Sequence, residues 1–319
     1  MELRRLGRSE LMVSPLCFGG NVFGWTADER TSFSILDAWI DAGFNFIDTA
    51  DVYSRWAAGH QGGESETVIG KWLKQGGGRR DKVVIATKVG MDMGDGKIGL
   101  APGYIRKAVE DSLRRLQVDR IDLYQAHKDD PDTPLEASLE AFAGLIEEGK
   151  VRAIGASNYS AARLSEALEI SRSKGLPRYE SLQPLYNLYD RAVFERELRP
   201  LCIKEEIGVI NFYSLAAGFL SGKYRTPEDA GKSPRGKGVV SKYVNDRGLK
   251  ILAALDEASK RTGSPPAQIA IAWVMAQPGI VSPIASASNL AQFDELVRAT
   301  RLKLDDDTLA LLDRASEET

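Results

Sequence analysis

The sequence has few of the residues that build disulfides, metal sites or membrane spans. Its 319 residues contain only two cysteines, Cys17 and Cys202, and two histidines, which excludes a disulfide framework and gives no zinc-ligand spacing. No apolar run approaches the roughly 20 residues that cross a bilayer, and the N-terminus lacks the apolar core of a signal peptide. We therefore expect a cytoplasmic protein, in a reducing compartment, with no metal centre and no membrane contact.

The charge of the chain is nearly balanced, since 42 basic residues meet 45 acidic residues and the formal net charge is −3. Nucleic-acid-binding proteins usually carry a basic surface, so this balance argues against a nucleic-acid partner. No G-x-G-x-x-G sequence follows an apolar run, and no P-loop is complete. A small molecule is the expected partner.

Short apolar runs alternate with amphipathic stretches of helical period along the chain. Helix signals agree with this alternation: Asp28 or Thr31 begins the first helix, Pro134 begins the fourth, and Gly149 ends it. The predicted strands span residues 15–20, 44–48, 82–90, 120–128, 150–158, 180–187, 208–214 and 279–288. Eight strand–helix units predict an α/β fold, a (β/α)8 TIM barrel that forms one domain over residues 1–319.

Two segments depart from the strand–helix repeat. Residues 2–14 precede the first predicted strand, and we expect a β-hairpin that turns at Gly7 to Ser9 and closes the bottom of the barrel. Residues 222–243 follow the seventh strand, are rich in glycine, proline and lysine, and show no helical period. Loops of this length are often lids over binding sites. We expect this segment to be a mobile lid.

Four reactive side chains lie at or just beyond the ends of three consecutive predicted strands. Asp48 and Tyr53 follow the second strand, Lys88 lies in the third, and His127 lies near the end of the fourth. In a (β/α)8 barrel, the C-terminal ends of the strands form the mouth that carries the active site. We expect the four side chains to meet there.

These residue types suit the reversible reduction of a carbonyl group, in which hydride reaches carbon and a proton reaches the developing alkoxide. Tyr53 would supply the proton. Because a free tyrosine has a pKa of about 10, an adjacent Lys88 ammonium is expected to stabilise the phenolate and bring proton transfer closer to physiological pH. Asp48 would hold Lys88 in an ion pair, and His127 would orient the carbonyl oxygen and assist proton relay.

Each of these residues has a plainer interpretation when taken alone. Tyr53 can pack at the rim, Lys88 and Asp48 can form an ordinary ion pair in the barrel core, and a structural role for His127 is about as well supported as a functional one. Packing at this level of a barrel favours branched apolar side chains. Four polar groups together therefore favour catalysis.

Six segments resemble successive signatures of the aldo-keto reductase superfamily, in the family's order and over nearly the whole chain: GFNFIDTADVYS, VIATKVG, DLYQAHKDD, GASNYS, LQPLYN and GFLSGKY. The Asp-to-Tyr spacing in DTADVY is the most specific part, together with the strand lysine and histidine that follow. The chain is most similar to the bacterial and potassium-channel β-subunit-like branch. The resemblance implies an NADP(H)-binding barrel that reduces an aldehyde or ketone, such as a sugar or an aromatic carbonyl, to an alcohol.

The resemblance also implies a set of cofactor contacts, which begins with the catalytic Asp48. Ser157, Asn158 and Gln183 match positions that hold the nicotinamide carboxamide, and the plainer alternative for each is a hydrogen bond at a strand end. Phe212 matches an aromatic that stacks on the nicotinamide, with Tyr213 as the alternative if the strand is offset by one. The remaining matches are Gly20, Asn21, Leu215, Ala216, Lys223, Ser286, Ser288, Gln292 and Glu295.

The segment expected at the adenosine end departs from the family pattern. Ala285 and Ser286 stand where proline and glycine are common, and no basic side chain is present there for a 2′-phosphate. Arg235 or Arg225, both in the predicted lid, can supply that charge because arginine binds phosphate in a bidentate manner. We favour NADP(H) and keep NAD(H) as the alternative.

Loop residues near the mouth are the candidates for substrate contact: Trp25, Tyr53, Trp56, His60 and His127. Trp56 and His60 can equally belong to a surface loop. Two other functions stay open at this point. A barrel lysine such as Lys88 can form a Schiff base, as in aldolases, and some members of the superfamily are non-catalytic NADPH-sensing regulatory subunits.

Overall fold

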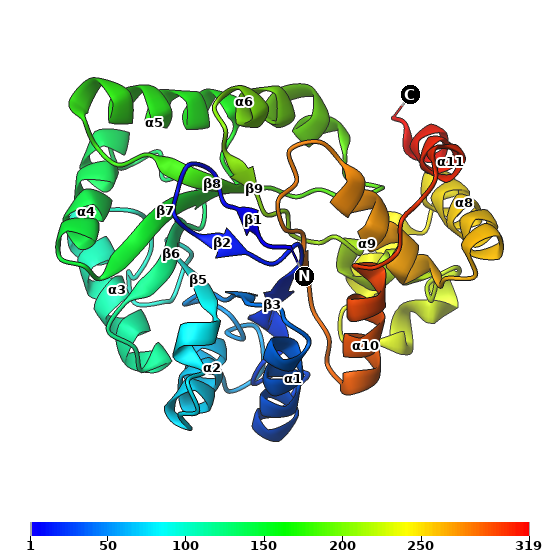
Figure 1. The fold of residues 1–319 in the computed structure, drawn as a ribbon, viewed down its shortest axis with the longest axis horizontal. Helices are drawn as coiled ribbons and strands as arrows, with labels where there is room; N and C mark the ends of the chain where they lie inside the picture. The colour runs from blue at the N-terminus through cyan, green and yellow to red at the C-terminus, as the bar shows by residue number, and fades with distance from the viewer. Residues whose placement is uncertain (1, 319) are drawn as a thin grey trace.

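Eight short parallel strands form the centre of the structure, a computed structural model that describes residues 2–318 (Figure 1). The sheet order is β10-β3-β4-β5-β6-β7-β8-β9, so strands adjacent in sequence are adjacent in space. The strands are β3 (Cys17–Gly19), β4 (Phe46–Asp48), β5 (Val84–Val89), β6 (Ile121–Ala126), β7 (Val151–Ser157), β8 (Tyr179–Gln183), β9 (Gly208–Val209) and β10 (Ile284–Ala285). All eight predicted strands are present, although β9 and β10 are much shorter than predicted.

The first and last strands of this order are joined by backbone hydrogen bonds. Val281 N–H donates to Val209 O over 2.9 Å, and Ile284 N–H donates to Asn211 O over 2.9 Å. A parallel bridge also links Val209 to Ile280. The sheet is therefore closed, and the predicted (β/α)8 architecture is confirmed.

Helices surround the strands, as Figure 1 shows. Asp28 is the residue that begins the first helix, because its side chain accepts a hydrogen bond from the Thr31 N–H. Gly149, with φ of +71°, follows the fourth helix and allows the chain to turn. The main helices are α1 (Glu29–Asp41), α2 (Glu64–Lys74), α3 (Pro102–Leu116), α4 (Leu135–Glu147), α5 (Ala161–Lys174), α6 (Arg199–Lys204), α8 (Asp246–Thr262), α9 (Pro266–Ala276), α10 (Leu290–Ala299) and α11 (Asp306–Ser316).

The hairpin of β1 (Arg4–Arg5) and β2 (Met12–Val13) lies across one end of the ring of strands (Figure 1). Its turn is at the predicted residues, with Ser9 N–H donating to Leu6 O. Leu6, Leu11 and Val13 are buried and pack with inward-facing strand residues in a small core inside the barrel. The hairpin therefore seals the bottom of the barrel with apolar side chains and leaves the opposite end to the polar ones.

The segment after β9 is more ordered than the sequence predicted. It contains the short helical turns η4 (Ala216–Ser221) and η5 (Pro227–Lys232), followed by α7 (Gly236–Tyr243). The prediction of no helix in residues 222–243 was therefore wrong for α7. Val239 and Tyr243, four residues apart, are buried, and the Tyr243 ring stacks on Phe219 at 5.4 Å. Packing against η4 thus stabilises α7. The glycines and lysines of this helix leave too few apolar residues for a helical period to be recognised in the sequence.

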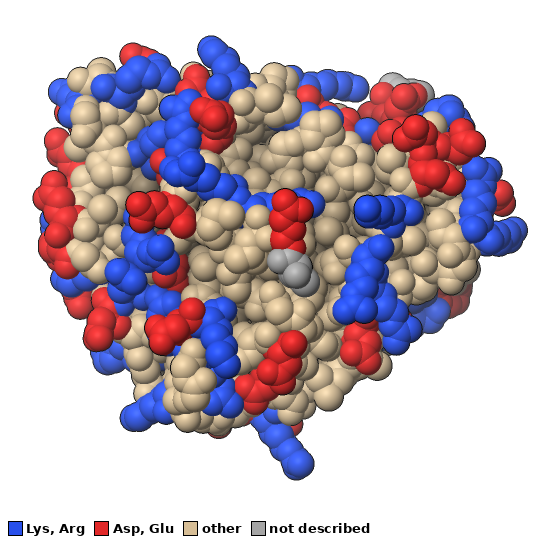
Figure 2. Space-filling model, in the orientation of Figure 1, with Lys and Arg blue, Asp and Glu red and all other residues tan. Residues whose placement is uncertain are grey.

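Basic and acidic side chains are interspersed on the face that the hairpin covers, without a broad area of one sign (Figure 2). This mixture agrees with the balanced charge of the sequence. No helix within residues 2–318 is both long enough and apolar enough to cross a membrane.

The contact between α2 and α3 leaves no room for a side chain at Gly70. A Cβ atom built at Gly70 would lie 2.1 Å from Arg115 O and 2.7 Å from Leu116 C. We expect Gly70→Ala to lower the free energy of unfolding by about 1–3 kcal/mol, although alanine has the higher helix propensity. Gly103→Ala in α3, where a Cβ meets nothing within 4 Å, is the control and should be neutral or stabilising. Urea unfolding measures both, and equal effects would contradict the tight contact.

Candidate active site

The alternation of side chains along the strands brings the predicted catalytic residues inside the barrel mouth. Phe46 and Ala86 belong to the small core within the barrel. Two residues further along the same strands, on the same face, lie Asp48 at the end of β4 and Lys88 in β5. His127 follows directly after β6, and its N–H donates to Val89 O. Apolar side chains thus fill the bottom of the barrel and polar ones its upper end.

Lys88 is at the centre of this group and is fully buried. Its Nζ lies 2.6 Å from Asp48 Oδ2, 2.8 Å from Tyr53 Oη and 2.8 Å from Thr49 O. An ammonium has three N–H donors, and these three acceptors use all of them. The predicted ion pair of Lys88 with Asp48 and its contact with Tyr53 are both present.

Two glutamines complete the hydrogen bonds of Asp48. Gln183 Nε2 donates to Asp48 Oδ1 over 2.9 Å, and Gln125 Nε2 donates to the same oxygen over 3.3 Å. Gln183 was predicted as a cofactor contact, and here it also fixes the carboxylate. Gln125 was missed by sequence reasoning. Its signal was its place two residues after the inward-facing Leu123, at a position where packing calls for an apolar side chain.

The pKa of Tyr53 departs from expectation. Burial raises it well above the usual value, and the Asp48 carboxylate raises it further. Lys88 donates to the Tyr53 oxygen and favours its ionised form, but burial and Asp48 outweigh this effect, so the pKa of Tyr53 is not brought closer to physiological pH. Tyr53 is therefore a neutral hydroxyl at physiological pH, and its O–H donates to Asp48 Oδ2 over 3.2 Å.

His127 lies beside Tyr53, with ring centroids 6.0 Å apart and the rings nearly perpendicular. Burial lowers the pKa of His127 well below its ordinary value, and the positive charges of Lys88 and Lys128 add to this effect. The imidazole is therefore neutral at physiological pH. A neutral imidazole presents one hydrogen-bond donor and one acceptor.

Aromatic side chains extend from Tyr53 towards the solvent. The Trp56 ring lies 5.9 Å from that of Tyr53, and the Trp25 ring lies 5.6 Å from Trp56. Trp56 is 50% exposed, so this row borders an accessible space. His60, which was predicted beside them, lines a separate cavity behind the same loop. The row can contact an apolar or aromatic group.

The polar residues at the ends of β7 and β8 are linked to one another. Ser157 Oγ donates to Gln183 O over 2.9 Å, and Asn158 Nδ2 donates to His127 O over 2.9 Å. Asn158 has φ of +56°, a left-handed conformation that asparagine tolerates. This network holds the three predicted carboxamide contacts beside Asp48 and His127.

The predicted lid reaches the mouth through Arg235. The Arg235 guanidinium lies 4.9 Å from the centre of the Trp25 ring. With the Asn21 amide oriented by its hydrogen bonds, Asn21 donates to Ser286 Oγ and accepts from Arg235 Nη2, both over 2.7 Å. Arg235 has no carboxylate partner within residues 2–318. Arg225, the other candidate, is held by a bidentate ion pair with Asp256 at 2.8 Å.

The other predicted cofactor residues lie around the same mouth. Tyr213 is 46% exposed, whereas Phe212 packs against the small core within the barrel. Ser288 N–H donates to Gln292 Oε1 over 2.8 Å at the start of α10, where Glu295 is exposed. Gly20 follows β3, and Leu215, Ala216 and Lys223 lie in or next to η4, with Lys223 Nζ over the Tyr224 ring.

Comparison with known proteins identifies the family of the chain. The sequence profile of the Aldo/keto reductase family matches residues 15–317. The chain belongs to the aldo/keto reductase family. It is 36% identical to an uncharacterized oxidoreductase, YrpG, of Bacillus subtilis, over 98% of this chain and 95% of that protein. It is 32% identical to the aldo-keto reductase YhdN of B. subtilis (92% and 85%) and 32% identical to a probable voltage-gated potassium channel subunit beta of Oryza sativa (94% and 91%).

Family membership confirms the resemblance found in the motifs and supports an oxidoreductase that acts on small carbonyl compounds with a nicotinamide cofactor.

The ion pair in the barrel gives a test of stability. Lys88→Met leaves Asp48 buried without its cation, and we expect the free energy of unfolding to fall by about 3–5 kcal/mol. Adding Asp48→Asn removes the uncompensated charge and should restore part of that loss. Urea unfolding at pH 7 of the single and double variants measures this coupling. A double variant no more stable than Lys88→Met would show that the pair is not coupled.

Proposed function

We propose that this aldo/keto reductase reduces an aldehyde or ketone to an alcohol, with Tyr53 as the proton donor. The observation that carries the proposal is the buried Lys88 ammonium, which donates both to Asp48 and to the Tyr53 hydroxyl. A tyrosine held only for packing does not require a buried ammonium at its oxygen, because burying that charge is costly.

Tyr53 would transfer its proton to the carbonyl oxygen as negative charge develops there. The high pKa of Tyr53 keeps the proton in place until an acceptor of sufficient basicity forms. Lys88 already donates to the phenolic oxygen, so its charge stabilises the phenolate that remains after transfer. Lys88 thus opposes the rise in the pKa of Tyr53 that burial and Asp48 cause, and it is the group that favours the phenolate.

His127 would orient the substrate. Its ring is neutral and lies beside the Tyr53 ring, so it can donate a hydrogen bond to the carbonyl oxygen without competing as an acid. Trp56 and Trp25 would contact the remainder of the substrate. An aromatic or otherwise apolar carbonyl compound fits this border best.

The polar groups at the mouth fit a nicotinamide dinucleotide. When bound, the reduced form would supply the hydride that reaches the carbonyl carbon. Asn158, Ser157 and Gln183 would hold its carboxamide, and the exposed Tyr213 ring is free to stack. Arg235 is a partly buried cation without a carboxylate partner in the described chain, which is the charge that a phosphate needs. We therefore propose NADP(H) ahead of NAD(H).

A Schiff-base mechanism on Lys88 fits this geometry poorly. A nucleophilic amine needs a free lone pair, whereas Lys88 donates three hydrogen bonds, one of them to a carboxylate at 2.6 Å. No feature of the site favours a sensor without turnover, because the proton donor and its ion pair are intact.

Replacement of Tyr53 by phenylalanine tests the proton donor. We expect Tyr53→Phe to lower kcat for 4-nitrobenzaldehyde by about 10²–10⁴-fold, because only the proton donor is lost. Fluorescence titration should show NADPH binding within a few-fold of the wild type. Tyr179→Phe removes a buried hydroxyl remote from Asp48 and is the matched control, with turnover expected to persist. An unchanged kcat in Tyr53→Phe would overturn the proposal.

A second pair of variants tests the nucleotide preference. Arg235→Leu should weaken NADPH binding by about tenfold or more and NADH binding much less, because a charge-assisted contact to the extra phosphate is lost. Arg225→Leu, in which the lost cation is already paired with Asp256, is the control. Fluorescence titration of both nucleotides gives the ratio. Equal losses for NADPH and NADH would assign Arg235 to the shared pyrophosphate instead.

A further inference from the structure

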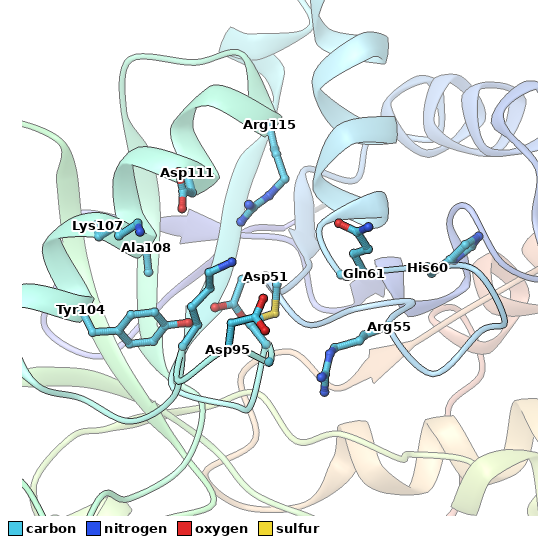
Figure 3. Close-up of a pocket in the computed structure, with 14 residues that line it drawn as sticks. Asp51, Arg55, His60, Gln61, Asp95, Tyr104, Lys107, Ala108, Asp111 and Arg115 are labelled. Atoms are coloured by element: carbon cyan, nitrogen blue, oxygen red, sulfur yellow. The ribbon is translucent and has the colours of Figure 1, made fainter.

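A second cavity lies behind the loop that carries Tyr53. Its volume is about 440 Å³, and its lining comes from the loop after β4, the loop after β5 and α3 (Figure 3). Tyr53, Lys88 and His127 are not among its lining residues. The loop after β4 thus has one face towards Lys88 and Asp48 and another towards this cavity.

Asp51 is the unusual member of the lining. The residue is 2% exposed, and neither carboxyl oxygen has a hydrogen-bond partner anywhere in residues 2–318. Buried carboxyl groups are normally satisfied, because an unpaired one costs free energy. Burial and the nearby Glu66 raise the pKa of Asp51 to about 8. At neutral pH the group is therefore mostly a carboxylic acid, which can donate a hydrogen bond.

Cations without carboxylate partners surround the same space. Lys97 and Lys107 line the cavity and form no ion pair within the described chain. Arg55 donates to Asp92 O, a backbone carbonyl. Figure 3 shows the Arg115 guanidinium and the Tyr104 hydroxyl turned towards Asp51 from α3.

The charges of the lining do not cancel. Asp95 and Asp111 are its other carboxylates, and Arg115 is already paired with Glu66 at 2.7 Å. With Asp51 protonated, the lysines and Arg55 leave the cavity with excess positive charge. No cluster of metal-binding side chains occurs in residues 2–318, so a cation is not the expected occupant.

We propose that this cavity binds a small oxyanion, a carboxylate or a sulfate-like group, which pairs with Lys97 and Lys107 and accepts a hydrogen bond from the Asp51 carboxyl group. The ligand would satisfy the Asp51 carboxyl group, which has no hydrogen-bond partner within residues 2–318, and would pair with the two lysines, which form no ion pair there. The proposal does not rest on the proposed carbonyl reduction, since Asp48, Tyr53, Lys88 and His127 do not line this cavity.

The test is calorimetric titration of the full-length protein with sodium sulfate and, separately, with malonate. Both anions keep their charge above pH 7, and the tighter of the two identifies the tetrahedral or the carboxylate class. We expect saturable binding that weakens at least tenfold in a Lys97→Met, Lys107→Met variant. Lys260→Met, an exposed lysine on α8, is the matched control. Binding that this double variant leaves unchanged, or no saturable binding, would overturn the proposal.

Asp51→Asn separates the role of the carboxyl proton. In the wild type, affinity should fall about tenfold between pH 7 and pH 9, because Asp51 loses its proton and repels the anion. The asparagine amide remains a donor, so Asp51→Asn should bind at pH 7 and lose this pH dependence. The lysines, Arg55, Arg115 and Tyr104 are present in both proteins, so the difference isolates Asp51. Loss of binding in Asp51→Asn at pH 7, with its melting temperature retained, would contradict the assigned role.

Anion binding at the barrel mouth is distinguished by Arg235→Leu. If sulfate binds at the barrel mouth, Arg235→Leu would abolish sulfate binding and the double lysine variant would retain it. That result would contradict the proposed anion site in the cavity. The opposite pattern supports it.

Discussion

The burial of one ammonium–carboxylate pair constrains the rest of the site. Lys88 and Asp48 are both inaccessible to solvent, so each hydrogen-bonding position around them has to be filled by the protein. Thr49 O, the Tyr53 hydroxyl, Gln183 and Gln125 fill them. The Tyr53 hydroxyl is therefore fixed at the mouth as part of this network, because it accepts from Lys88 and donates to Asp48.

The sequence predicted best those site residues whose positions follow the two-residue alternation of side chains along a strand. Asp48 and Lys88 were placed correctly because inward-facing positions alternate along β4 and β5, and parallel strands bring their ends together. Gln125 follows the same period, two residues after the inward-facing Leu123, but was missed because an amide there is not itself a reactive group. The helix α7 was missed because its stability comes from Phe219 and other tertiary contacts rather than from its own composition.

The same limit applies to charges in the lid. Sequence alone favoured Arg235 as the partner for a phosphate and kept Arg225 as an alternative. The fold separates them, since Asp256 on α8 pairs with Arg225 from a distant part of the chain, whereas Arg235 rests on Trp25 and Asn21 at the mouth. An unpaired arginine is a more useful indicator of a ligand than the number of basic residues in a loop, because a paired one has already used its charge.

The loop after β4 connects the barrel mouth to the cavity beside Asp51 through its backbone. The Tyr53 hydroxyl accepts from Lys88, while Asp51, two residues earlier, lines the cavity. Asp51 N–H donates to Lys88 O over 3.3 Å, so both residues are anchored to the strand that carries the central ammonium. The charges also interact, because an ionised Asp51 raises the pKa of Lys88 and the Lys88 cation lowers the pKa of Asp51. An anion beside Asp51 would therefore oppose the ionisation of Asp51 and, through that carboxyl group, change the field at Lys88 without touching the substrate.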